Sequence, residues 1–240
     1  MTNRSESSDA AAQVHSGECS LRSFDGLRSV CPLMHKIFGQ LENLARSDAP
    51  VLLQGESGTG KYRAAQALHQ ASARRARPLV TVVCTALPAA QLDALLGCPT
   101  AGHARAVQSP LLKARAGTLL LRDLTALDLH AQSVLLRALQ NEPSLDLNPR
   151  RAAKRVRLIS TAAHDLAKRV KQGLFRSDLY YRLVAAQVQL PPLRERPADI
   201  ALLAHDALHQ VARAQGRPVP KLDPQAVQLL TGYGWPGNLR

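Results

Sequence analysis

The stretch Gly55-Glu56-Ser57-Gly58-Thr59-Gly60-Lys61 decides the fold of this chain. Its spacing, G-x-x-x-x-G-K, is that of a phosphate-binding loop between a strand and a helix. Residues 51–54 are apolar enough for a short buried strand, and helix-forming residues continue from Tyr62 to about Arg75. The glycines allow backbone N–H groups to turn inward, and the helix directs its positive end to the same place.

These properties predict that the loop holds a nucleotide, with Lys61 reaching the terminal phosphates. The predicted contacts come from Gly55, Glu56, Ser57, Gly58, Thr59, Gly60, Lys61 and Tyr62. An ordinary glycine-rich turn is the alternative, but the strand–loop–helix context favours the phosphate loop. Tyr62 departs from the general pattern, which has a serine or threonine there to hold Mg²⁺.

The composition is globular, with 45% hydrophobic residues in a chain of 240. This length allows one large domain, or a domain with a small lid. No apolar run reaches the length of a membrane span, and the polar first residues do not form a signal peptide. The four cysteines form no C-x-x-C pair, which favours buried thiols in a reducing cytoplasm.

The net charge is +13, with basic clusters at 74–77, 150–155 and 168–171. Such a balance permits binding to nucleic acid or to a nucleotide. Charge runs are more often solvated surface, so the charge does not decide the function by itself.

Strands alternate with helices as far as residue 190. Strands are predicted at 51–54, 79–83, 118–121, 156–160 and 186–190, and helices at 33–45, 62–75, 89–96, 128–141, 166–171 and 177–183. This alternation predicts a parallel sheet with helices on both faces. The pattern then becomes all helical, at 197–214 and 224–231. We therefore expect a disordered segment at 1–24, an α/β core at 25–195 and an α-helical lid at 196–240.

Four blocks of sequence carry a family resemblance. They are residues 47–61, Phe175-Arg-Ser-Asp-Leu-Tyr-Tyr-Arg-Leu183, Leu190-Pro-Pro-Leu-Arg-Glu-Arg196 and Trp235-Pro-Gly-Asn-Leu-Arg240. Together and in this order they resemble the central domain of sigma-54-dependent transcriptional activators, which are bacterial enhancer-binding ATPases of the AAA+ class. The resemblance runs from about residue 25 to residue 240.

The resemblance implies an AAA+ P-loop fold, a three-layer α/β sandwich followed by a small α-helical lid. It also implies ATP at the interfaces of a ring, whose subunits are copies of this chain or homologous AAA+ subunits. In the family, hydrolysis remodels RNA polymerase that carries sigma-54. We expect no direct DNA binding and no membrane contact from these residues, and a cytoplasmic location.

Four residues take site roles from this resemblance. Asp123 stands where the family has the carboxylate that activates water. Arg176 and Arg182 match the arginine fingers that reach the ATP of a neighbouring subunit. Arg240 matches the lid arginine that senses the nucleotide within the same subunit.

Several positions depart from the family pattern. Arg122 stands where the family has the aspartate that orients Mg²⁺, and a guanidinium there repels the metal. Val83 replaces an asparagine that restrains the catalytic glutamate, and Ala162-Ala163 replaces a Thr-Asn sensor that neither alanine can imitate. Residues 101–106, Ala-Gly-His-Ala-Arg-Ala, replace the apolar loop that contacts sigma-54. These changes predict ATP binding with weak or absent hydrolysis, and they disfavour Mg²⁺.

Two alternatives stay open. The chain could be a working ATPase that uses Asp123, or a truncated gene product with a fold and no function. His205-Asp-Ala-Leu-His209 resembles the H-E-x-x-H zinc helix, but no third ligand is evident and a polar helix face accounts for it. We therefore predict no metal site.

Overall fold

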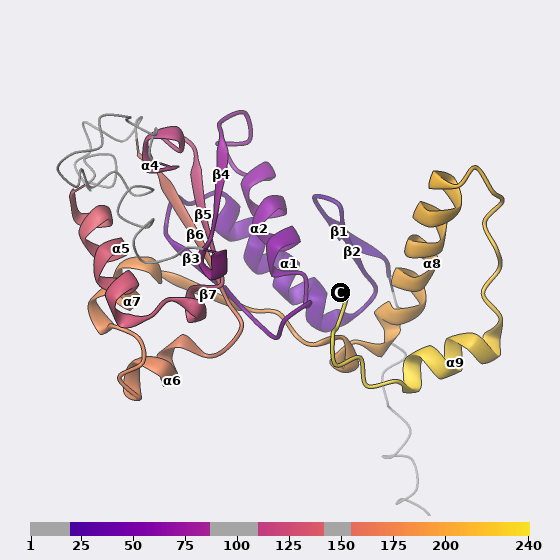
Figure 1. Ribbon diagram of the computed structural model, residues 1–240. Helices are drawn as coiled ribbons and strands as arrows, with labels where there is room; N and C mark the ends of the chain where they lie inside the picture. Colours follow the sequence, from indigo (N-terminus) through magenta and orange to yellow (C-terminus); the bar gives the residue numbers. More distant parts are fainter. Residues whose placement is uncertain (1–19, 87–109, 142–154) are drawn as a thin grey trace, which may run out of the picture.

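The chain folds around a parallel β-sheet, as the alternation of strands and helices predicts (Figure 1). The computed structural model describes residues 20–86, 110–141 and 155–240. Within these ranges the sheet has the order β4-β5-β6-β3-β7, and each neighbouring pair of strands is parallel. The strands are β3 (Val51–Gln54), β4 (Leu79–Val83), β5 (Thr118–Arg122), β6 (Arg157–Ala162) and β7 (Ala186–Gln189).

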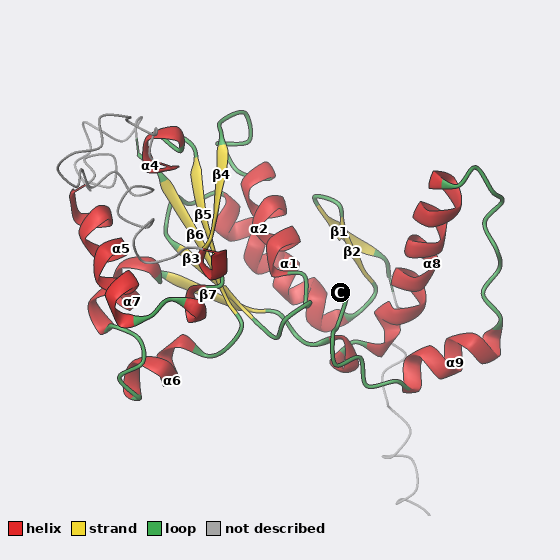
Figure 2. Ribbon diagram, viewed as in Figure 1, coloured by secondary structure: helices red, strands yellow, loops and turns green. Residues whose placement is uncertain are grey.

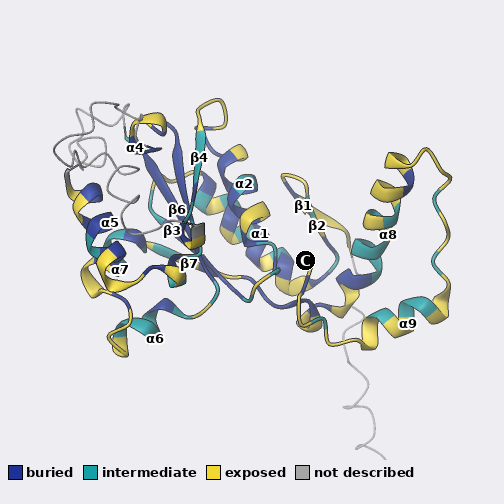
Figure 3. Ribbon diagram, in the orientation of Figure 1, coloured by how far each residue is buried: buried dark blue, intermediate teal, exposed yellow. Residues whose placement is uncertain are grey.

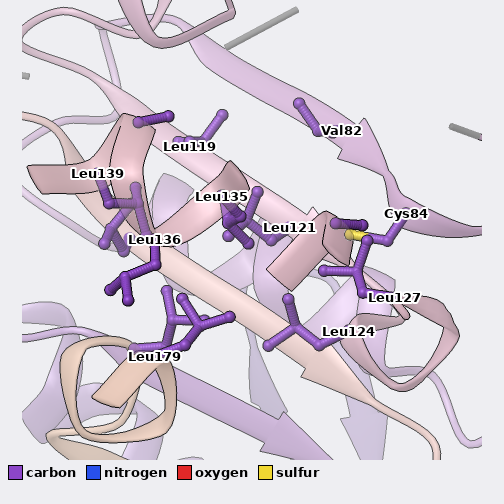
Figure 4. Close-up of a cluster of buried hydrophobic side chains, with 14 of the residues drawn as sticks. Val82, Cys84, Leu119, Leu121, Leu124, Leu127, Leu135, Leu136, Leu139 and Leu179 are labelled. Atoms are coloured by element: carbon purple, nitrogen blue, oxygen red, sulfur yellow. The ribbon is translucent and has the colours of Figure 1, made fainter. Parts of the chain in front are cut away.

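Helices cover both faces of this sheet and make it the middle of three layers (Figure 2). The larger helices of the core and their neighbours are α1 (Pro32–Ala45), α2 (Lys61–Gln70), α4 (Pro110–Lys113), α5 (Leu129–Asn141), α6 (Leu166–Lys171) and α7 (Ser177–Leu183). Alternation along β5 assigns the faces: Leu119 and Leu121 pack with α5 and α7, whereas Leu120 packs with α1 and α2. Figure 4 shows the first of these two clusters.

The strands are apolar in succession because both faces of the sheet are covered. All four residues of β3 and all six of β6 are buried, as the dark strands of Figure 3 show. Strand β3 is an interior strand of the sheet, with β6 and β7 as its neighbours. The loop 55–61 therefore begins at the carboxyl edge of the sheet, where ligands of open α/β sheets bind.

A lid of two helices, α8 (Pro197–Ala214) and α9 (Pro224–Gly232), follows the core and stands beside α1 (Figure 1). Asp199 at the start of α8 joins the two parts. Its carboxylate is fully buried and accepts hydrogen bonds from Ser29 Oγ at 2.8 Å, Val30 N at 2.8 Å and Cys31 N at 3.1 Å. These donors replace the water that a buried charge loses. In the described ranges no helix is both long and apolar enough to cross a lipid bilayer.

The prediction of disorder over residues 1–24 is wrong for residues 22–24. They form β1 (Arg22–Phe24), which pairs antiparallel with β2 (Leu27–Ser29) through an Asp25-Gly26 turn with positive φ at both residues. Phe24 is 5% exposed, and its ring stacks on that of Phe38 in α1 with 6.2 Å between centroids. Burial of this ring stabilises a hairpin that the polar composition around it conceals.

Other predicted bounds differ in smaller ways. The helix expected to reach Arg75 ends at Gln70, because Ser72 Oγ donates to His69 O and accepts from Arg74 N, which competes with helical hydrogen bonds. Strand β6 runs to Ala162 rather than ending at residue 160. The helix expected at 89–96 and the loop at 101–106 lie outside the described residues.

We predict that the layer between β5 and α1–α2 carries much of the stability. Leu120→Ala removes a side chain that is 0% exposed, and should lower the free energy of unfolding by about 2–5 kcal/mol. Leu229→Ala, at a side chain that is 77% exposed, is the matched control and should change it by less than about 0.5 kcal/mol. Urea unfolding of both variants measures the difference. Equal losses would contradict this assignment of the core.

Candidate nucleotide-binding site

The loop after β3 has the backbone that its glycines predict. Gly55, Gly58 and Gly60 have φ values of 148°, 81° and 101°, which side chains rarely adopt. A Cβ on Gly55 would lie 2.6 Å from the carbonyl oxygen of Leu190, and one on Gly58 would lie 2.0 Å from that of Gly237. Glycine is therefore required at both positions for the loop to lie between β7 and the end of the lid.

Lys61 begins α2, and its ammonium group points back into the loop. Nζ donates to the carbonyl oxygens of Gly55 and Glu56, both at 2.7 Å. Burial lowers the pKa of this group, Asp123 opposes the shift, and Arg240 adds to it. A cation that burial disfavours and carbonyl oxygens hold is well placed to bind an anion. The glycine backbone and this lysine fit a nucleotide phosphate.

The end of the lid lies on the loop. Asn238 is 2% exposed, and its side-chain amide bridges the parts: Oδ1 accepts from Leu193 N at 2.7 Å and Nδ2 donates to Ser57 O at 2.8 Å. The backbone N–H of Leu239 donates to Gly58 O at 3.0 Å. From the start of the lid, Arg196 donates to Thr59 O at 3.0 Å. Both ends of the lid therefore hold the loop.

An ion pair adds charge to this contact. The carboxylate of Glu56 accepts from Arg194 at 2.5 and 2.8 Å, and Asn238 Nδ2 lies 3.3 Å from it. The hydrogen bond from Arg194, followed by that from Asn238, lowers the pKa of Glu56 to about 2. Glu56 is thus a contact of the loop with the lid region in addition to being a predicted nucleotide residue.

Two cavities open on either side of the loop. The larger, about 790 Å³, lies between the β1–β2 hairpin, α1 and α8, and Thr59, Gly60 and Arg240 are part of its lining. The smaller, about 480 Å³, is lined by Ser57, Thr85, Asp123, Thr125, Ala126, Ala163, His164, Arg169 and Arg240. Arg240 faces both. A nucleotide has a largely apolar base and an anionic phosphate tail. The larger cavity has apolar side chains of α1 and α8 in its lining and suits the base, whereas the smaller one is mostly polar and suits the phosphates.

Asp123 is the acidic member of the smaller cavity. It has left-handed backbone angles, φ 60° and ψ 57°, and its N–H donates to Thr161 Oγ1 at 3.0 Å. A non-glycine residue in this conformation marks local strain of the kind that gathers at functional sites. Ala163 lies in the same cavity and offers no side-chain hydrogen bond there. The smaller cavity therefore contains the Asp123 carboxylate, and position 163 contributes only a methyl group to it.

Arg122, the residue before this carboxylate, lies over an aromatic ring. Its guanidinium carbon is 4.3 Å from the centroid of the Tyr62 ring, in the range of a cation–π contact. Across the sheet, Arg122 is the register partner of Val83. Tyr62, which departs from the general phosphate-loop pattern, is therefore close in space to Arg122 and Val83, which the resemblance gives as departures from the family pattern.

The two arginine-finger candidates lie elsewhere. Arg176, at the start of α7, pairs with Asp178 at 2.7 Å and donates to Ser133 Oγ at 3.1 Å. Arg182 donates to Leu139 O at 2.6 Å. In the described part of the chain, neither residue lines a cavity beside the loop of its own subunit.

Sequence reasoning missed several residues of this site. Asn238 and Arg196 lie inside two of the quoted blocks, so the signal was present, but only Arg240 was given a role there. His164 and Arg169 follow β6 and carried no pattern that distinguished them from surface residues. His205 and His209 are exposed, and their rings make an edge-to-face contact with 4.5 Å between centroids. Among the described residues, no cluster of three acidic, histidine or cysteine side chains could hold a metal.

Two of the cysteines are buried free thiols, Cys31 and Cys84. Burial, with a contribution from Asp123, raises the pKa of Cys84 to about 12. This thiol is therefore protonated near neutral pH and is a structural residue, as expected from the sequence. Cys19 and Cys98 lie outside the described residues.

The fold and the loop together define an AAA+ nucleotide-binding domain with its helical lid. The family model of the sigma-54 interaction domain matches residues 27–189, and that of the AAA+ ATPase lid domain matches residues 194–240. The chain belongs to the sigma-54 interaction domain family, which confirms the resemblance of its four blocks.

Relatives and solved structures agree with this assignment. The Nif-specific regulatory protein of Azotobacter vinelandii is 38% identical over 218 residues, which cover 87% of this chain and 41% of that protein. NtrC of Azospirillum brasilense is 39% identical over 215 residues, or 87% of this chain and 44% of that protein. The crystal structure of NtrX from Brucella abortus in complex with ATP is 30% identical with a TM-score of 0.77, and the match covers 89% of this chain and 50% of that one. The chain thus spans half or less of the length of these relatives.

We predict that the Glu56–Arg194 pair makes stability depend on pH. The folded pKa of about 2 lies below the ordinary 4.5, so the stabilisation is fully present above about pH 4.5 and is lost as the pH falls toward 2. Thermal unfolding of the wild type and of Glu56→Gln should differ most above about pH 5 and converge as the solution is acidified. Glu42→Gln, which breaks an exposed pair with Arg22, is the control. A difference that is independent of pH would contradict the prediction.

Proposed function

We propose that this chain is the ATP-binding AAA+ module of a sigma-54-interaction-type transcriptional regulator, and that its own hydrolysis is weak or absent. The observation that carries the proposal is the contrast within one site. The phosphate-binding loop and its lysine have the geometry that their sequence predicts, whereas the family resemblance assigns Arg122 to the metal position and Ala163 to the sensor position.

Nucleotide binding is supported by the loop, the start of α2 and the two cavities. Lys61 can exchange its two carbonyl partners for phosphate oxygens, which are stronger acceptors because they are charged. NtrX of Brucella abortus, a structural relative, has been crystallised with ATP and with ADP. Arg240 faces both cavities and can contact the bound phosphates, as the family resemblance implies.

Weak hydrolysis is supported by what surrounds Asp123. A γ-phosphate in the smaller cavity would meet Ala163, which cannot orient water, and would lie near Arg122, whose charge opposes a metal ion. Catalysis of phosphoryl transfer depends on positioned groups and metal charge, so the loss of several members reduces the rate strongly. Mg²⁺ is therefore not a cofactor that these residues favour.

Assembly is the remaining activity, and it fits where the arginines lie. Arg176 is exposed and forms an ion pair with Asp178. A phosphate group, which carries more negative charge, could replace Asp178 as the partner of this arginine. Because the family resemblance implies arginine fingers at Arg176 and Arg182, we propose that they serve the nucleotide of a neighbour, either a copy of this chain or a homologous AAA+ subunit. RNA polymerase with sigma-54 would be the target of such a ring, through a changed contact loop at 101–106.

A working ATPase is the second candidate, and the place of Asp123 favours it. Its carboxylate lines the same cavity as Ser57 of the loop and interacts with the Lys61 charge. This aspartate could activate water if a substitute for the missing groups were present. The two candidates differ in turnover and agree on binding.

We predict measurable ATP and ADP binding without matching turnover. Isothermal titration should give a Kd for the wild type that Lys61→Ala raises by about tenfold or more, because two charge-assisted hydrogen bonds are lost. Lys221→Ala, an exposed lysine between α8 and α9, should leave it unchanged. Phosphate release should stay far below that of an active relative measured alongside. A folded wild type that binds no nucleotide contradicts the first part, and turnover like the relative's supports the Asp123 ATPase instead.

We also predict donation of the arginines in trans. An active homologue whose own arginine fingers are substituted should regain hydrolysis when this chain is added, and the Arg176→Ala, Arg182→Ala variant should not restore it. Arg217→Ala, an exposed lid arginine, is the matched control and should restore activity like the wild type. Co-assembly is checked by size-exclusion chromatography. Mixed rings in which the wild type restores nothing would show that the donor role is wrong.

A further inference from the structure

Tyr62 and Arg122 occupy the two positions at which P-loop proteins place their Mg²⁺ ligands. The first is the Ser or Thr after the loop lysine, and the second is the acidic residue at the end of the neighbouring strand. Here the first residue is a phenol and the second a guanidinium, and the two are in contact at 4.3 Å. The two unusual residues therefore form one cation–π contact at the place where other P-loop proteins bind Mg²⁺.

These residues do not fit Mg²⁺. The ion requires oxygen ligands in octahedral geometry, and neither the face of an aromatic ring nor a guanidinium supplies one. Lys61 directly precedes Tyr62 in the chain, and the charge of Arg240, which lines the smaller cavity, acts on it. Asp123 is the carboxylate that remains in that cavity, and one carboxylate among these cations is a poor magnesium site.

The contact with Tyr62 holds the Arg122 guanidinium in place. The ring of Tyr62 supports the guanidinium from one face, and its hydroxyl group is held by Gln66 Nε2 at 3.3 Å in the next turn of α2. Val83, the partner of Arg122 across the sheet, offers no charge. Among the described residues, no carboxylate lies within 4.0 Å of Arg122, unlike Arg176 and Arg194. Its N–H donors are therefore available to an anion.

We propose that the Arg122 guanidinium takes the place of Mg²⁺, so that this site binds the metal-free form of a nucleoside polyphosphate in preference to its metal complex. The inference rests on the nucleotide binding proposed above. A guanidinium is permanently charged and binds phosphate oxygens with two parallel hydrogen bonds. The metal complex carries less negative charge and brings a second cation toward Arg122, Lys61 and Arg240, so it loses attraction to the site.

The sign of the magnesium effect tests this inference. ATP is titrated into the protein in EDTA and in excess MgCl₂, with potassium chloride keeping the ionic strength equal. In the wild type, Mg²⁺ should raise the Kd by about fivefold or more. In Arg122→Asp the effect should reverse, and Mg²⁺ should lower the Kd. Arg217→Asp makes the same change of charge between α8 and α9, and should keep the wild-type sign.

Variants of the tyrosine test the support of the guanidinium. Tyr62→Phe keeps the ring face and should keep the preference for metal-free ATP. Tyr62→Ala should weaken metal-free binding by about two- to fivefold, the value of an exposed cation–π contact.

Three outcomes would overturn the inference. Tighter wild-type binding with Mg²⁺, or an unchanged preference in Arg122→Asp, removes it and leaves the proposed nucleotide binding standing. Absence of binding in both buffers, with the protein folded, removes the inference and the proposed function together.

Discussion

The carbonyl oxygens of the phosphate loop are the constraint on which the arrangement of core and lid depends. Each carbonyl from Gly55 to Thr59 accepts a hydrogen bond. Lys61 donates to the first two, Gly55 and Glu56. The lid donates to the other three: Asn238 to Ser57, Leu239 to Gly58 and Arg196 to Thr59. The N–H of a peptide unit points away from its carbonyl. The lid holds the carbonyls of Ser57 and Thr59, so the N–H groups of the same peptide units, those of Gly58 and Gly60, point to the opposite side, where an anion can bind.

The lid is consequently bonded to the loop of the proposed nucleotide site. Glu56 has an ionic contact with Arg194, and Asn238 fastens the end of the lid to the same loop. Any movement of the loop toward a phosphate changes these bonds, and any movement of the lid changes the loop. Lys61 adds to the coupling, because it must leave two carbonyls to reach a phosphate and thereby releases two loop acceptors.

Sequence reasoning was accurate where local chemistry sets the structure. The bounds of α6, α7 and α8 match the prediction, because Asp165 caps the first and Pro197 starts the last. The Asp25-Gly26 turn was a recognisable hairpin signal that the polar surroundings obscured. The roles of Asn238 and Arg196 could not be predicted in the same way. Their meaning depends on loop carbonyls that lie far away in the sequence and meet them only through packing of the lid.

The contact between Tyr62 and Arg122 is the feature of the site that could least be predicted from the sequence. Taken alone, each residue disfavours a metal ion, because the Tyr62 hydroxyl is bonded to Gln66 and the Arg122 guanidinium is positively charged. The start of α2 and the end of β5 come together only when the sheet has formed, with β6 between β5 and β3. In that geometry the face of the Tyr62 ring stabilises the positive charge of Arg122. Restoring either position alone would leave the other without its partner, so the two substitutions act as one feature of the site.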